Sequence, residues 1–73
     1  MMPVVTIRIT RGPTLEDKRA LAAAVTDAVA STLALPAERV RILIEEYELE
    51  NVATGGELHA DRARRDGDGP FEV

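Results

Sequence analysis

Apolar and polar residues alternate along the first part of the chain, from Val4 to Thr10. Val5, Ile7 and Ile9 are separated by polar residues, and most residues of the segment are β-branched. This period of two predicts a β-strand with one apolar and one polar face. A Gly-Pro pair at residues 12–13 ends the strand.

A helical period replaces the period of two between Leu15 and Leu33. Thr14, three residues before Asp17, predicts an N-terminal capping box with Asp in place of the usual Glu. Pro36 ends the helix, because the residue before a proline avoids the α region. The apolar stripe consists of Leu21, Ala24, Val25, Ala28, Val29 and Leu33. The pattern predicts one amphipathic helix.

The period of two returns from Arg39 to Glu46, where Val40, Ile42 and Ile44 share one face. A strand, a helix and a second strand form a βαβ unit, whose two strands run parallel. We therefore predict an α+β fold with one helix across a parallel strand pair. The expected core consists of Val5, Ile7, Ile9, Leu21, Val25, Ala28, Val29, Ile42 and Ile44.

The character of the sequence changes after Tyr47. Residues 51–58 are short and contain Gly55 and Gly56, which indicates a small hairpin whose tight turn needs positive φ. Residues 59–73 are polar and rich in glycine, which indicates a mobile tail, docked near Phe71. We expect one domain over residues 1–58, followed by this tail.

The chain has none of the usual devices that stabilise a small domain. Its 73 residues include no cysteine, and His59 is the only histidine, so neither a disulfide framework nor a structural zinc site is expected. A domain of this size buries only about 60% of its unfolded surface. Oligomerisation is the remaining way to enlarge the core, and we expect a homo-oligomer.

Charge and hydropathy exclude several classes of partner. Thirteen acidic and nine basic residues give a net charge of −4, which argues against nucleic acid. No apolar run approaches the roughly 20 residues of a membrane span, and no signal-peptide pattern is found at the start. These observations favour a cytoplasmic protein that binds neither nucleic acid nor membrane.

Pro3 has two chemical interpretations, which depend on where translation starts. A proline before a strand is an ordinary strand opener, because no ladder N–H is lost there. At the mature amino terminus its nitrogen would instead be a secondary amine, both a base and a nucleophile. A start at Met1 leaves Pro3 as an amide, whereas a start at Met2 followed by methionine removal exposes the amine.

The ordered set of these features resembles the 4-oxalocrotonate tautomerase family, small bacterial enzymes built as hexamers of short βαβ subunits. The resemblance runs without gaps up to Leu58. It rests on Pro3, Gly12, the helix start at residues 16–18, Pro36, "VRILI" at residues 40–44 and "GGEL" at residues 55–58.

The resemblance implies a cofactor-free isomerase that interconverts enol and keto forms of a small 2-hydroxydienoate or 2-oxo acid. Its catalytic acid/base would be Pro3 as an amino-terminal amine. Desolvation and nearby cations disfavour the charged form of such an amine and lower its pKa. The free amine can then take a proton from an enol and return it at a distant carbon.

The substrate-binding residues of the family match only in part. Arg41 matches the second-strand arginine that binds the carboxylate of a neighbouring subunit's substrate. The other family arginine falls on Pro13, and the aromatic position of the hairpin falls on Val52. Arg11 or Arg8 could supply the missing positive charge. These departures argue against the dicarboxylate substrate that is standard in the family more than they argue against the fold.

Simpler interpretations stand beside these assignments. Arg41 could be a solvated residue or form an ion pair with Glu45 on the same face. Arg8 and Arg11 could be surface or interface charges. We expect His59 to be exposed, and the mixed charges of residues 61–66 to form a solvated segment rather than a nucleic-acid arm. The alternative function is that of a non-catalytic subunit in a mixed or structural hexamer.

Overall fold

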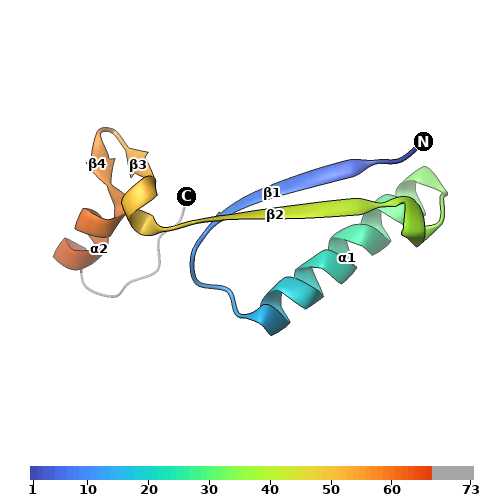
Figure 1. Cartoon of the computed structure of the whole chain (residues 1–73), viewed down its shortest axis with the longest axis horizontal. Helices are drawn as coiled ribbons and strands as arrows, with labels where there is room; N and C mark the ends of the chain where they lie inside the picture. The colour runs from blue at the N-terminus through green and yellow to red at the C-terminus, as the bar shows by residue number, and fades with distance from the viewer. Residues whose placement is uncertain (67–73) are drawn as a thin grey trace. The chain divides into compact units, whose positions relative to one another are not determined.

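The computed structural model describes residues 1–66, and the predicted position of Phe71 lies outside them. The elements follow the order β1 (Val4–Thr10), α1 (Leu15–Leu33), η1 (Ala37–Arg39), β2 (Arg41–Tyr47), η2 (Leu49–Asn51), β3 (Ala53–Thr54), β4 (Glu57–Leu58) and α2 (His59–Asp66), as Figure 1 shows. The chain divides into two compact units. The first contains residues 1–8 and 12–45, and the second contains residues 9–11 and 46–66.

Strands β1 and β2 pair in parallel, as the βαβ pattern predicts. At one end the amide of Arg41 donates to the carbonyl oxygen of Pro3, 3.0 Å away. At the other end the amide of Arg11 donates to the carbonyl oxygen of Tyr47 at 2.8 Å. Strand β2 begins two residues later than predicted, because residues 37–39 form the turn η1.

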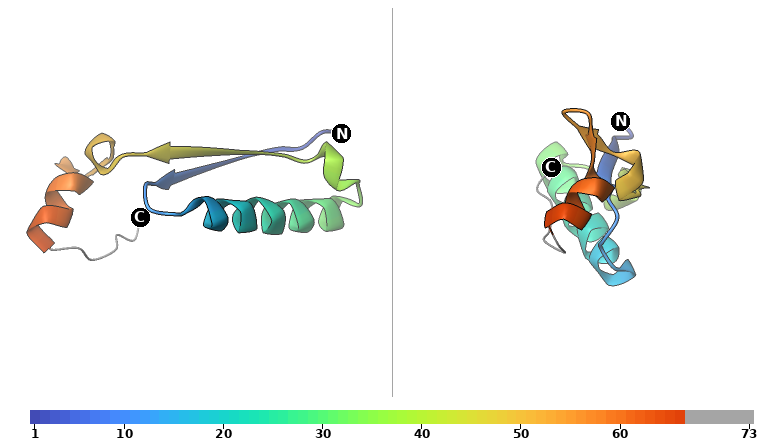
Figure 2. Two further views of the ribbon diagram at one scale, coloured as in Figure 1. Left: turned by 60° about the horizontal axis from the view of Figure 1, so that its bottom comes forward. Right: turned by 90° about the vertical axis from the view of Figure 1, so that its left-hand side faces the viewer.

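Helix α1 has the predicted bounds and lies along one side of the two strands (Figure 2). Its capping box is present: the amide of Asp17 donates to Oγ1 of Thr14 at 3.1 Å, and the amide of Thr14 donates to Oδ2 of Asp17 at 2.9 Å. The helix ends at Ala34, which has a left-handed conformation with φ 54°. Since Pro36 follows, the helix cannot continue.

The predicted core residues lie on the predicted faces, but one chain does not bury them. Along β1, Val5, Ile7 and Ile9 are half-buried while their neighbours at positions 4, 6 and 8 are exposed. Ala28, assigned to the core from its spacing, is exposed on α1. Among the described residues no apolar side chain is fully buried. A two-stranded sheet and one helix cover only one face of each element.

The second unit contains the predicted hairpin and an additional helix. Strands β3 and β4 pair antiparallel, with Ala53 opposite Leu58 and Thr54 opposite Glu57. Gly55 and Gly56 form the turn with φ values of 61° and 84°, as predicted. Helix α2 occupies the first eight residues of the segment that we expected to be a tail, and it packs against η2 and β4.

No helix within residues 1–66 combines the length and the apolar character that crossing a membrane requires.

Candidate active site

Pro3 and Arg41 lie at the same end of the strand pair. Pro3 directly precedes β1, and Arg41 is the first residue of β2. Their backbones are joined by the hydrogen bond from the Arg41 amide to the Pro3 carbonyl oxygen, 3.0 Å long. The fold thus brings together the two residues that the sequence singled out for acid/base chemistry and carboxylate binding.

The alternation of the strands assigns their side chains to opposite faces. Pro3 is half-buried and continues the series of half-buried positions Val5 and Ile7. Arg41 is exposed and pairs in register with Val4, which is 55% exposed. One chain therefore does not direct both side chains into one cavity of its own.

Arg8 and Glu45 form an ion pair on the exposed face of the strand pair. Nε of Arg8 lies 3.0 Å from Oε1 of Glu45, and the two side chains are 72% and 42% exposed. The ion pair considered for Glu45 was with Arg41, but the carboxylate instead pairs across the strands with Arg8. Among the side chains of positions 1–64, none forms an ion pair with the Arg41 guanidinium.

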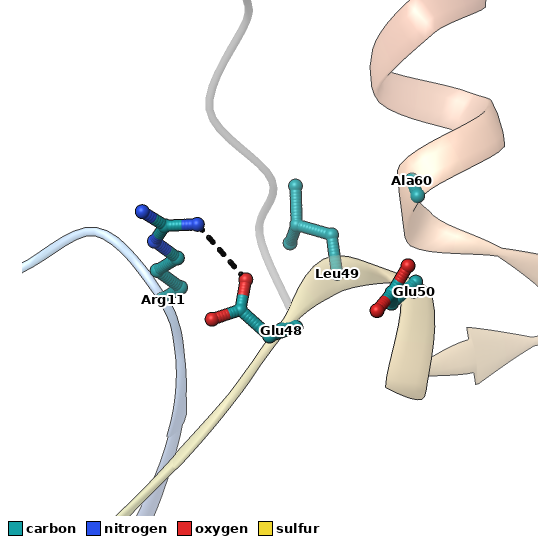
Figure 3. A pocket seen from close by; sticks show the side chains of 5 residues that line it. All are labelled: Arg11, Glu48, Leu49, Glu50 and Ala60. Carbon is teal, nitrogen blue, oxygen red and sulfur yellow. Dashed lines mark hydrogen bonds and ion pairs between the residues drawn. The ribbon is translucent and has the colours of Figure 1, made fainter.

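Arg11 lies in the second unit, at the edge of an open pocket of about 300 Å³ (Figure 3). The other lining residues are Glu48, Leu49, Glu50 and Ala60. One nitrogen of the Arg11 guanidinium lies 3.0 Å from Oε2 of Glu48. Two carboxylates and one guanidinium leave the pocket with a net negative charge. As it stands, the pocket does not favour a substrate carboxylate.

Val52 lies at the base of the hairpin, just before β3, and its side chain is half-buried. Its carbonyl oxygen accepts a hydrogen bond of 2.8 Å from the amide of His59. The β3–β4 register makes His59 the residue opposite Val52. The hairpin therefore fixes the position of Val52 through its backbone.

The expectation that His59 is exposed is wrong. Its side chain is only 3% exposed, and Nε2 lies 2.8 Å from Oγ1 of Thr54. The segment that we expected to be a tail instead forms helix α2, which begins at His59 and packs against η2 and β4. The missed signal is the helical spacing of His59, Ala60 and Ala63, which are buried or half-buried while Asp61, Arg62 and Arg64 are exposed.

The described residues contain no group of three or more histidine, cysteine, aspartate or glutamate side chains suited to a metal ion.

Comparisons with known proteins identify the family of the chain. The family model described as tautomerase enzyme matches residues 3–62, from Pro3 into helix α2. The chain is 41% identical over 64 residues to 2-hydroxymuconate tautomerase of Pseudomonas sp. strain CF600, which covers 88% of this chain and all of that protein.

Two solved structures have the same fold. A 4-oxalocrotonate tautomerase isozyme from Methylibium petroleiphilum superimposes with a TM-score of 0.80 at 36% identity, over 86% of this chain and 98% of that one. A heterohexamer 4-oxalocrotonate tautomerase from Chloroflexus aurantiacus superimposes with a TM-score of 0.76 at 30% identity, over 82% and 97%. The parallel βαβ unit, the hairpin and the match from Pro3 to residue 62 place this chain in the tautomerase family.

Proposed function

We propose that the protein is a cofactor-free tautomerase with Pro3 as its amino-terminal acid/base. Its substrate would be a small 2-hydroxydienoate or 2-oxo acid, consistent with its similarity to 2-hydroxymuconate tautomerase. The observation that carries the proposal is the position of Pro3 beside Arg41, at the shared end of β1 and β2.

Tautomerisation needs a base, a positively charged group that stabilises the enolate, and an apolar wall that excludes water. The secondary amine of Pro3 removes the enol proton and returns a proton at a distant carbon. The Arg41 guanidinium binds the substrate carboxylate and stabilises the negative charge that develops on the dienolate. Val52 on the hairpin supplies part of the apolar wall in place of an aromatic side chain.

The site would be shared between subunits. Pro3 and Arg41 belong to opposite faces of one strand pair, so a cavity containing both side chains takes them from different chains. A second argument is the lack of any fully buried apolar side chain among the described residues of a single chain. We propose a hexamer of βαβ subunits in which the hairpin reaches a neighbour. A homohexamer is the simplest form, and a heterohexamer like that of the Chloroflexus relative is the alternative.

The substrate is expected to carry one carboxylate. The position of the second family arginine is Pro13, and the two nearby candidates, Arg8 and Arg11, each hold a glutamate at 3.0 Å. Loss of a charge-assisted hydrogen bond costs about 1.5–3 kcal/mol. Dicarboxylates should therefore have no advantage over monoacids such as phenylenolpyruvate.

The test compares two forms of the protein, one starting at Met1 and one starting at Pro3, on the same enol substrate. Intact mass establishes the first residue of each. We expect the Pro3 form to be active and the Met1 form to be inactive, because an amide nitrogen has no basicity. Equal activity would exclude the terminal amine as the base. Inactivity of both, in an assembled protein, would favour the non-catalytic subunit.

A further inference from the structure

Among the described residues of a single chain, His59 alone is buried, with only 3% of its surface exposed. It belongs to none of the chemistry above. It lies immediately after β4, as the first residue of α2. No apolar side chain among the described residues is buried, so a buried polar ring calls for a structural reason.

Two hydrogen bonds connect His59 to the opposite strand of the hairpin. Its amide donates to the carbonyl oxygen of Val52 at 2.8 Å, and its Nε2 lies 2.8 Å from Oγ1 of Thr54. Residues directly opposite each other in an antiparallel pair point to the same face, and diagonal neighbours are within reach of a ring. His59 therefore spans Val52 and Thr54, which share that face two residues apart.

The elements around this ring explain why it is held there. Helix α2 begins at His59 and packs against both η2 and β4, and the ring is buried at this first residue of the helix. A two-residue strand pair is marginal without additional contacts. The hydrogen bond to Thr54 ties the turn side of the hairpin to its base, where Val52 lies.

We propose that His59 is a positioning residue for the active site, acting through Val52. The inference rests on the proposed function, in which Val52 forms part of the substrate wall. By linking the Val52 carbonyl and the Thr54 hydroxyl, His59 holds the hairpin in the one conformation that presents the Val52 side chain. The affinity for substrate then depends on a hydrogen bond that the substrate does not touch.

The sharpest test alters Thr54 rather than His59, because replacing a buried ring can prevent folding. Thr54→Val keeps the shape of the side chain and removes the hydroxyl. Thr54→Ser keeps the hydroxyl and is the matched control. Both are made in the full-length chain beginning at Pro3 and are assayed on phenylenolpyruvate, with the hexamer content measured alongside.

The expected result for Thr54→Val is a KM about 2- to 12-fold higher, the range for loss of one hydrogen bond, with kcat unchanged. Thr54→Ser should resemble the parent chain. His59→Gln should retain part of the affinity, because its terminal amide extends about as far as Nε2, whereas the shorter His59→Asn should not. A purely structural role would lower the amount of assembled enzyme and hence kcat, without raising KM.

Amide hydrogen exchange gives a measurement that needs no activity. The His59 amide, which donates to Val52, should exchange faster in Thr54→Val than in Thr54→Ser. An unchanged KM in Thr54→Val, or a loss confined to kcat, would overturn the role of His59. If the parent chain turned over no enol, the proposed function and this role would both be overturned. Faster exchange in Thr54→Val would then show only that the bond holds the hairpin.

Discussion

The amide of Arg41 lies 3.0 Å from the carbonyl oxygen of Pro3, yet the two side chains belong to opposite faces of the strand pair. The backbone contact fixes both residues at one end of the sheet. The alternation of side chains along the strands places their two side chains on opposite faces. If both groups act on one substrate, as proposed above, the opposite side-chain faces favour a site that combines two copies of the chain.

Two replacements of Arg41 distinguish the effect of its positive charge from the effect of its bidentate geometry. Arg41→Ala should raise KM and lower kcat, because the guanidinium binds the substrate carboxylate and also stabilises the dienolate. Arg41→Lys keeps the charge but loses the bidentate fork, so its losses should be smaller. Steady-state kinetics on a monocarboxylate enol measures both variants. Arg8→Ala is the control on the same face, and an equal effect there would contradict a specific role for Arg41.

Mixing two chains, one without the proline amine and one with the weakened Arg41→Ala site, tests whether the site is shared. One chain retains Met1 and so has no free proline amine, and the other begins at Pro3 but has Arg41→Ala. Refolded together at equal amounts, they should regain roughly a quarter of the parent activity, since random assembly gives that share of sites both intact groups. The two chains assembled separately and then combined are the control. Lack of recovery in verified mixed hexamers would show that each chain completes its own site.

The local sequence predicted β1 and α1 well because their signals are short-range. Val4–Thr10 and Leu15–Leu33 have the predicted bounds, and the Thr14–Asp17 capping box forms as expected. Alternation, helical spacing and caps depend on neighbours within a few residues. The same signals overestimated the core, as Ala28 shows, since spacing identifies a face but not what covers it.

The second unit was less predictable because its helix depends on tertiary contact. The polar composition after Leu58 suggested a tail, and only contact with η2 and β4 gives α2 a surface to cover. The pairing of Arg11 with Glu48 joins residues 37 positions apart. No local pattern specifies such a pair. The sequence thus identified the candidate arginines, but it did not show which of them form an ion pair with a glutamate.

The pairing of Arg11 with Glu48 predicts how substrate choice can be changed. Glu48→Gln removes the negative partner of Arg11, so that a second substrate carboxylate can compete for the guanidinium. Exposed ion pairs contribute about 0.2–1 kcal/mol, so kcat/KM for a dicarboxylate should rise between about 1.4- and 5-fold. A monocarboxylate should show no change.

Glu50→Gln is the matched control for this variant, because Glu50 lines the same pocket without pairing to Arg11. An equal rise in both variants would indicate a general electrostatic effect. No rise in Glu48→Gln would show that Arg11 lies outside the substrate site.

The capping box predicts a stability effect that is independent of catalysis. Thr14→Ala removes the hydroxyl that accepts from the Asp17 amide and should lower the free energy of unfolding by about 0.5–2 kcal/mol per chain. Thr14→Ser keeps an accepting hydroxyl and should cost little. Denaturant titration at one fixed chain concentration measures the difference, since stability of an oligomer depends on concentration. Equal losses in the two variants would assign the effect to side-chain packing.

Leu43 tests the assembly directly. Leu43 lies on the same face of β2 as Arg41 and is 46% exposed in a single chain. Burying a leucine side chain stabilises a protein or an interface by about 1.5–3 kcal/mol. If a neighbouring subunit covers this face, Leu43→Glu places an unpaired charge in the interface and should shift the protein toward smaller species at micromolar concentration. Leu43→Met, of similar volume, should assemble normally. Sedimentation velocity distinguishes these outcomes, with enol turnover measured on the same samples. A parent chain that sediments as a folded monomer, or a Leu43→Glu chain that remains hexameric and active, would contradict an interface on this face.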